Sequence, residues 1–454
     1  MNFTRLTRIV VVIAAAIAIL NQDRLQDIDF LFPYCGALAA FYFVKLFLGL
    51  GNRFVVIDIL EFLCVNNLLF VPSLFESLSD DYLKEINLMF PLSDSYFLLA
   101  VPCVLMLLAG FSLNLKNRAE LEQKELVREE NKQFQTIGLS LFICGVAFTL
   151  INTFFPIGLV ADMFASAGKV GILYLLMSRY KSGKILLYVY FGIIMLDSLG
   201  RGMMGEFFWW IVVLGMFYLR LFPINIWQKL SYAVVFLFVI GLIQAVKGEY
   251  RLATWQNEGE LAGMSSSKVY MRLISGKLSS DAFFSPEESL AVLSRFNQGY
   301  LTAMTLDYTP DFEPFANGET IYTAVLASMA PRILWPDKPT AGGMWSLERF
   351  AGVEAMGNTS MSIGVLGEAY VNFNYRGAAI FLFFYALFIN YVYSLFLEKG
   401  KATPYIILWI PAAFFGLFSF ETDFLTIMNF FVKFMIFFVG LYYAVYNFWR
   451  VKLW

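Results

Sequence analysis

The stretch "RGAAIFLFFYALFINYVYSLFL" (376–397) carries no charged residue after Arg376. About 20 mostly apolar residues suffice for a helix to cross the hydrocarbon core of a bilayer. The chain contains further runs of this kind: 59% of its 454 residues are hydrophobic and only 15% are charged, against roughly 25% charged in soluble domains. A soluble core cannot absorb that excess, so we expect a polytopic membrane protein.

About twelve transmembrane helices are expected, and the fold class is therefore all-α. Backbone groups inside a bilayer must be paired within the protein, and no period-2 pattern suggests a barrel. The runs at 8–20 and 184–197 are the shortest. The expected spans lie near 8–20, 30–50, 54–75, 95–115, 136–155, 157–178, 184–197, 203–222, 230–247, 376–397, 404–420 and 425–447.

The distribution of Lys and Arg predicts the orientation. Alternate short connections carry 17 of these residues, whereas those of the opposite parity carry only Arg24, Lys84 and Arg201. Because cytoplasmic loops are enriched in Lys and Arg, both termini are expected in the cytoplasm. The first run lacks a small-x-small cleavage site, so it is interpreted as a span and not as a signal peptide.

The expected organisation has three parts. Helices 1–9 fill residues 1–247, a loop of 128 residues on the outer side covers 248–375, and helices 10–12 fill 376–454. Short amphipathic helices are expected in the loop at 285–301 and 317–332, because each has apolar residues at i, i+3 and i+4 spacing. They are expected to lie at the membrane surface and cover the bundle.

The loop contains the stiff, charged segment "PRILWPDKP" (331–339). Pro331 ends the preceding helix, and the later prolines fix a turn from which the side chains of four residues project. Such a turn suits an anionic, carbohydrate-bearing ligand, since guanidinium groups bind phosphate and indole faces stack on sugars. A structural proline turn that anchors Trp and Lys at lipid headgroups is the equal alternative. The four residues are Arg332, Trp335, Asp337 and Lys338.

Other polar residues are expected on the same side of the membrane. Each arginine alone fits a lipid-headgroup contact, but together with Arg332 they favour a site for a phosphorylated lipid. Glu368 is expected on the approach to the tenth span. The residues are Arg201 in "LDSLGRGMMGE" (196–206), Arg251 after the ninth span, Arg295, Asn297 and Gln298 in "SRFNQG" (294–299), and Glu368 in "IGVLGEAYVNFNYRG" (363–377).

Composition also limits the chemistry. The chain has no histidine, and its four cysteines lie in apolar runs without metal-type spacing, so no metal or cofactor is expected. The net charge of −2 argues against a nucleic-acid partner. Charges deep in the spans (Asp58, Glu61 and Lys433) are costly in lipid and are interpreted as structural pairs within the bundle.

The motifs "SRFNQG", "PRILWPDKP" and "SIGVLGEAYVNFNYRG", with an Arg-Gly pair between two helices, resemble those of Wzy-type polymerases of O-antigen and exopolysaccharide repeat units. The resemblance implies a fold similar to class C glycosyltransferases in a bacterial inner membrane, with the large loop in the periplasm. It implies metal-independent transfer between undecaprenyl-diphosphate-linked oligosaccharides, which serve as donor and acceptor. A chain-length regulator and a flippase are further partners.

The resemblance also implies roles for individual residues. The arginines would stabilise the departing lipid diphosphate, and Glu368 or Asp337 would accept the proton of the acceptor hydroxyl. Two alternatives stay open. O-antigen ligases generally use a loop histidine, which this chain lacks, and a lipid-linked oligosaccharide flippase is expected to show repeated halves.

Overall fold

The computed structural model describes residues 3–86, 88, 92–155, 158–201, 204–279, 285–353, 361–417, 420, 422–450 and 452–453. Within these ranges all regular structure is helical and no strand occurs. The chain divides into two compact units, which are described separately. The first comprises Met1–Gly49, Val55–Lys124 and Phe296–Lys452, and the second comprises Leu50–Phe54, Glu125–Arg295 and Leu453–Trp454.

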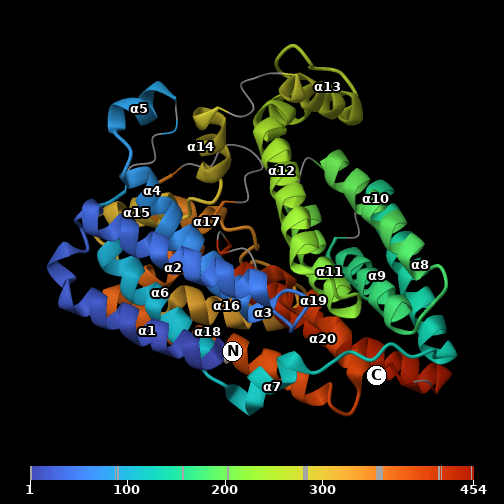
Figure 1. The fold of residues 1–454 in the computed structure, drawn as a ribbon. Helices are drawn as coiled ribbons and strands as arrows, with labels where there is room; N and C mark the ends of the chain where they lie inside the picture. Colours follow the sequence, from blue (N-terminus) through green and yellow to red (C-terminus); the bar gives the residue numbers. More distant parts are fainter. Residues whose placement is uncertain are drawn as a thin grey trace. The chain divides into compact units, whose positions relative to one another are not determined.

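The first unit consists of helices from both ends of the sequence (Figure 1). A π-helical turn, Asn66–Phe70, joins α3 to α4, so that Val56–Glu76 is one continuous span. Its helices are α1 (Phe3–Leu20), α2 (Ile28–Gly49), α3 (Val56–Val65), α4 (Val71–Glu76), α5 (Asp80–Glu85), α6 (Tyr96–Ser112), α7 (Arg118–Gln123), α15 (Gly299–Tyr308), α16 (Glu319–Met329), α17 (Met344–Ala351), α18 (Gly364–Lys399), α19 (Ile410–Phe414) and α20 (Phe424–Trp449).

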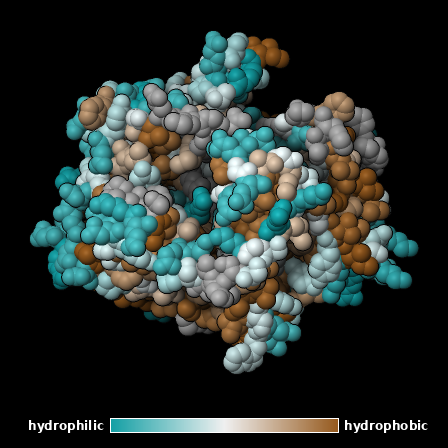
Figure 2. Space-filling model, turned by 90° about the horizontal axis from the view of Figure 1, so that it is seen from above, coloured by the Kyte–Doolittle hydropathy of each residue, from teal (hydrophilic) through white to brown (hydrophobic). Residues whose placement is uncertain are grey.

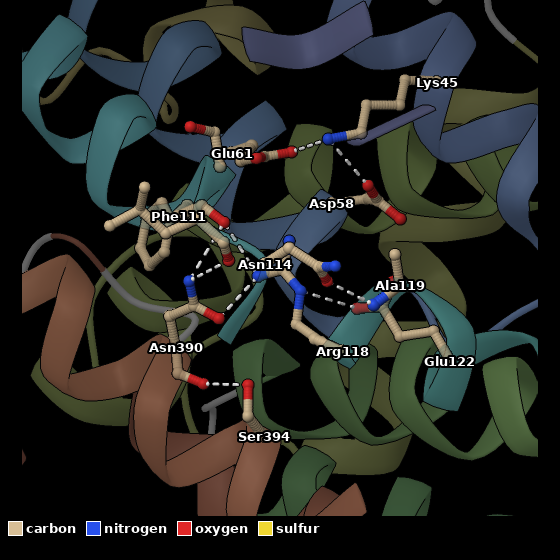
Figure 3. A network of polar contacts seen from close by, with 12 residues as sticks. Lys45, Asp58, Glu61, Phe111, Asn114, Arg118, Ala119, Glu122, Asn390 and Ser394 are labelled. Atoms are coloured by element: carbon tan, nitrogen blue, oxygen red, sulfur yellow. Dashed lines mark hydrogen bonds and ion pairs between the residues drawn. The ribbon is translucent and has the colours of Figure 1, made fainter. Parts of the chain in front are cut away.

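The contact between α6 and α18 organises this unit. Gly110 lets the two backbones approach, since a Cβ there would lie 2.7 Å from the carbonyl oxygen of Phe383. Asn390 of α18 donates hydrogen bonds to the carbonyls of Gly110 and Leu113, each at 2.9 Å, and accepts one from Arg118 at 2.7 Å (Figure 3). These bonds satisfy carbonyls that the end of a helix leaves without partners.

Buried charges join α2 to α3. The ammonium group of Lys45 lies 3.1 Å from Asp58 and also donates a hydrogen bond to Glu61, and all three side chains are buried (Figure 3). The expected pairing inside the bundle is confirmed for Asp58 and Glu61, and their shared partner is Lys45. For Lys433 no ion pair with an acidic side chain is found within the described part of the chain. A buried pair of this kind fixes how two helices pack, because separating the charges would leave them unpaired.

The second unit contains α8 (Lys132–Phe154), α9 (Leu159–Met177), α10 (Gly183–Arg201), α11 (Met204–Leu221), α12 (Ile226–Arg251), α13 (Ser266–Leu278) and α14 (Pro286–Ser294). Glycines allow α8 and α9 to pack closely. A Cβ on Gly145 would lie 2.4 Å from the Cα of Gly168, so any side chain there would separate the helices. Close packing through small residues is typical of helices in membranes.

The expected all-helical membrane fold is confirmed, but the number of twelve spans is not. Six helices in the described ranges are long and apolar enough to cross a bilayer, or seven if the bent pair of α6 and the following segment counts as one. The expected span at 404–420 is divided into short helical segments, which begin at Pro404 and next to Pro411. In Figure 2 hydrophilic side chains cover much of the face presented, and hydrophobic ones gather mainly toward the edges of the view.

The amphipathic helices expected in the long connection are present. Ser285 caps α14 by accepting a hydrogen bond from the backbone N–H of Glu288 at 3.2 Å. The expected helix 285–301 is interrupted after Ser294, because the backbone N–H of Gln298 donates to the carbonyl of Asn67 at 3.2 Å. α16 ends at Met329, two residues before Pro331.

Candidate functional site

Two arginines meet in the second unit. Arg251 is the last residue of α12 and Arg295 follows α14 directly, and these two helices contact each other. The terminal Nη2 of Arg295 approaches α12 at Gly248, 4.0 Å from the position of a Cβ there, and its charge repels that of Arg251. The folding of α14 onto α12 thus brings together two residues that are 44 positions apart in the sequence.

Acidic side chains do little to neutralise the positive charge of Arg251 and Arg295. The guanidinium of Arg251 lies 4.4 Å from the ring centre of Trp255, and its Nε is buried without a hydrogen-bond partner in the described part of the chain. The nearby carboxylates of Glu249 and Glu288 are paired with Lys277. In the described part of the chain neither guanidinium has an ion pair with a carboxylate, and two such groups near each other have the charge and geometry that suit a multiply charged anion.

Arg201, the third arginine expected at such a site in this unit, is the last residue of α10. Its side chain lies outside the described part of the structure.

In the first unit, the segment 331–339 forms turns, as its prolines predict. Arg332 is exposed and donates a hydrogen bond to the carbonyl of Pro336 at 3.4 Å. Lys338 points inward and is 9% exposed, and its ammonium group donates to the carbonyls of Ala327 and Ala330, both at 2.9 Å. Lys338 thereby closes the C-terminal end of α16. This structural role differs from both roles that the sequence predicted for the lysine, ligand binding and anchoring at lipid headgroups.

Of the other residues of the turn, Trp335 is half-buried and Asp337 is exposed. Lys433 of α20 lies close enough to Lys338 and Arg332 for their charges to repel. Three cations are therefore gathered near this turn.

Glu368 lies within α18, which begins at Gly364, and its side chain is only 1% exposed. Both carboxylate oxygens are occupied. One accepts a hydrogen bond from the hydroxyl of Thr320 at 2.8 Å, and the other accepts from the backbone N–H of Phe424 at 2.6 Å. Glu368 therefore connects the starts of α16 and α20, an arrangement that favours a positioning role over direct contact with a substrate.

A second carboxyl group is buried beside it. Asp423 caps α20 by accepting a hydrogen bond from the N–H of Thr426 at 3.0 Å, and its burial raises its pKa above the ordinary value. Neither carboxyl group borders the open pocket described next.

An open pocket of about 380 Å³ lies next to this network in the first unit. It is lined by Phe315, Asn317, Asn372, Phe373 and Asn374. Two aromatic side chains and three amides, without a charged group, suit a neutral sugar, which offers C–H faces for stacking and hydroxyls for hydrogen bonds. No role was predicted for these asparagines; the local indication is that Asn372 and Asn374 flank Phe373.

The backbone at this pocket is unusual. Asn374 has φ 57° and ψ −176°, a conformation that is essentially restricted to glycine, and it interrupts the helical geometry of α18. The neighbouring Asn372 is buried, where it donates hydrogen bonds to Thr320 at 2.7 Å and to the carbonyl of Glu368 at 2.8 Å. The pocket is thus held by the same network that fixes Glu368.

Asn297 and Gln298 lie at the start of α15. Gln298 is buried and borders a cavity of about 10 Å³, roughly the room for one water molecule. The backbone N–H of Gly299 donates to Asn297 at 3.1 Å. The Nδ2 of Asn297 and the Oε1 of Gln298 are buried without a hydrogen-bond partner among the described residues, and neither side chain borders the larger pocket.

Arg251 and Arg295 therefore lie near each other in the second unit. In the first unit Arg332 is exposed, Lys338 is turned inward, and Glu368 belongs to a separate network. Among the described residues, no group of three or more His, Cys, Asp and Glu side chains could hold a metal ion. Comparisons of the chain with models of protein families, with curated proteins and with solved structures find no match.

Proposed function

We propose that the chain polymerises undecaprenyl-diphosphate-linked oligosaccharide repeat units into O-antigen or exopolysaccharide at the periplasmic face of a bacterial inner membrane. The observation that carries the proposal is the pair of Arg251 and Arg295. Two adjacent guanidinium groups at the end of an apolar helix match a ligand that combines a diphosphate with a long lipid.

The reaction is a glycosyl transfer. The bond between the anomeric carbon of the donor glycan and the diphosphate oxygen breaks, and the electron pair leaves with the diphosphate. A new bond forms between that carbon and a hydroxyl oxygen of the acceptor, and the hydroxyl proton passes to a base. Preorganised cations stabilise the negative charge that develops on the departing diphosphate, and Arg251 and Arg295 supply them.

Two features of the first unit, taken by itself, also agree with the assignment. The uncharged pocket lined by Phe315, Phe373 and three asparagines suits the sugar part of a substrate. Of the two carboxylates considered as the base, Asp337 is exposed, whereas Glu368 has both oxygens in hydrogen bonds. Asp337 is therefore the better candidate for the proton acceptor.

The proposal is tested with purified protein in liposomes supplied with lipid-linked repeat units. Arg251→Ala and Arg295→Ala should each reduce the initial rate of polymer formation by at least tenfold, since losing one partner of a charged contact typically costs about 2–5 kcal/mol. Arg272→Ala is the matched control, because Arg272 is an exposed arginine of α13 in the same unit.

Unchanged polymer from both variants of the pair would contradict the assignment. Transfer of glycan onto a lipid A–core acceptor without a polymer ladder would identify a ligase instead.

A further inference from the structure

The segment from α16 to Gly342 runs along α20 and returns. α16 starts beside the start of α20, where Glu368 bonds both Thr320 and Phe424. It then packs along α20. The return is fixed by a hydrogen bond of 3.0 Å from the backbone N–H of Gly342 to the hydroxyl of Thr426. Both ends of the segment therefore lie at the N-terminal end of α20.

The turn between these ends lies much further along α20. α16, which starts level with Phe424 and packs against α20, has 11 residues, and the charges of Arg332 and Lys338 act on Lys433, which is nine residues after Phe424. At 1.5 Å per residue this is about 14 Å along the helix axis. α20 is long and apolar enough to span a bilayer from its first residue, and the hydrocarbon core is about 30 Å thick. The turn thus lies near the middle of the depth that α20 crosses.

Most of the exposed surface of the segment matches this depth, while the exposed charges of Arg332 and Asp337 must face protein or water and not acyl chains. The outer face of α16 and the turn expose an apolar stripe at helical spacing, formed by Tyr322, Leu326, Met329 and Ile333. Ile333 is 92% exposed, and the adjacent Leu334 is 79% exposed. Exposing such a continuous apolar stripe to water would be energetically unfavourable.

The opposite face carries Thr320, Ala324, Ala327 and Ser328, which are buried. Small residues of this kind permit close packing between helices in lipid.

The end of α16 is also adapted to an apolar environment. A helix end leaves carbonyls unpaired, and water cannot satisfy them inside a bilayer. Lys338 donates to two of these carbonyls from within the turn itself. This contact would be unnecessary for a helix that ends in water.

We propose that residues 319–342 form a re-entrant hairpin that enters the bilayer beside α20, with the apolar stripe in contact with lipid acyl chains. The sequence predicted that residues 317–332 form a short helix on the membrane surface, whereas in this proposal the segment enters the bilayer. In Figure 1, α16 accordingly lies among the long helices of the first unit, beside α18. The inference does not depend on the proposed function.

The test measures the depth of a spin label in liposomes by its collisions with oxygen, which concentrates in lipid, and with a water-soluble nickel chelate. Single cysteines are introduced as Ile333→Cys and Met329→Cys. Only Cys144 needs replacement first, because Cys35, Cys64 and Cys103 are buried. The lipid reference is Ile436→Cys on the exposed face of α20, and the control is Phe312→Cys, an exposed apolar position that precedes the hairpin.

Labels at 333 and 329 should resemble the label at 436, with frequent oxygen collisions and at least fivefold fewer nickel collisions than the label at 312. A label at 333 that meets the nickel chelate as often as the label at 312, while the label at 436 remains protected, would overturn the hairpin. The circular dichroism of every labelled variant is compared with that of the parent protein. If a variant at 333 or 329 is unfolded, Leu334→Cys takes its place, because it reports on the same turn.

Discussion

Replacing Glu368 by alanine should destabilise the first unit strongly. The change removes the acceptor of two hydrogen bonds, one from Thr320 and one from the backbone of Phe424, at a site that is closed to water. Each buried donor left without a partner costs about 1–3 kcal/mol. Because two donors are affected, the expected loss is about 2–6 kcal/mol, before any contribution from the cavity.

Glutamine provides the informative comparison. Its amide oxygen can accept from the N–H of Phe424, and its amino group can donate to the hydroxyl oxygen of Thr320. Only the hydroxyl hydrogen of Thr320 then loses its partner, so Glu368→Gln should cost about 1 kcal/mol. If Glu368 holds other groups in position, this variant should keep most of the polymerising activity.

The assay is the unfolding of the purified protein in mixed micelles as SDS is added, followed by circular dichroism and paired with the initial rate of polymer formation. We expect the order wild type, Glu368→Gln, Glu368→Ala in both measurements. Glu368→Gln that is stable but inactive would refute the positioning role and identify Glu368 as the catalytic base. A loss below about 0.5 kcal/mol for Glu368→Ala would refute the energetic reasoning.

Further predictions concern the hairpin and its anchor. Lys338→Met should lower the free energy of unfolding by about 2–6 kcal/mol, because the carbonyls of Ala327 and Ala330 lose their donor; a loss no greater than that of the exposed Lys268→Met would contradict this. Arg332→Ala should reduce polymer formation more than Pro336→Ala does, with Arg332→Lys in between, since the bidentate guanidinium and not the turn alone would serve the substrate; the reverse order would make the turn only a scaffold. The hydrogen bond from Arg349 lowers the pKa of Glu319, so this pair stabilises the protein above the ordinary glutamate pKa of about 4.3, and the stabilisation disappears as the pH falls through the lowered pKa. In Glu319→Gln the melting temperature should therefore fall less steeply with pH below about pH 4.3 than in the wild type. The same steepness in both proteins would show that the pair contributes nothing to stability.

Local patterns predicted the parts of the fold that depend on neighbouring residues. Ser285 followed by Pro286 predicted the start of α14, and Pro331 predicted the end of α16. The spacing of Asp58 and Glu61 predicted that they share a face, but their partner Lys45 lies on another helix. A pairing between helices depends on tertiary packing, which spacing along one helix does not specify.

Side-chain direction was harder to predict in the candidate site. In "PRILWPDKP" the charges of Arg332 and Lys338 look equivalent, yet only Lys338 turns inward, because the carbonyls at the end of α16 lie within its reach. Asn374 lies between Phe373 and Tyr375, just before the apolar run that forms most of α18. Asparagine tolerates positive φ better than most residues, but nothing in the local pattern distinguishes this position from Asn372.

The central claim, polymerisation of lipid-linked glycans, is tested most directly with the purified protein in liposomes and a single lipid-linked repeat unit as the only substrate. Glycan length and released undecaprenyl diphosphate are measured in the same sample. We expect a ladder of products that differ by one repeat, with one lipid diphosphate released for each bond formed. The claim would be contradicted if the folded protein left the repeat units unchanged and released no lipid diphosphate.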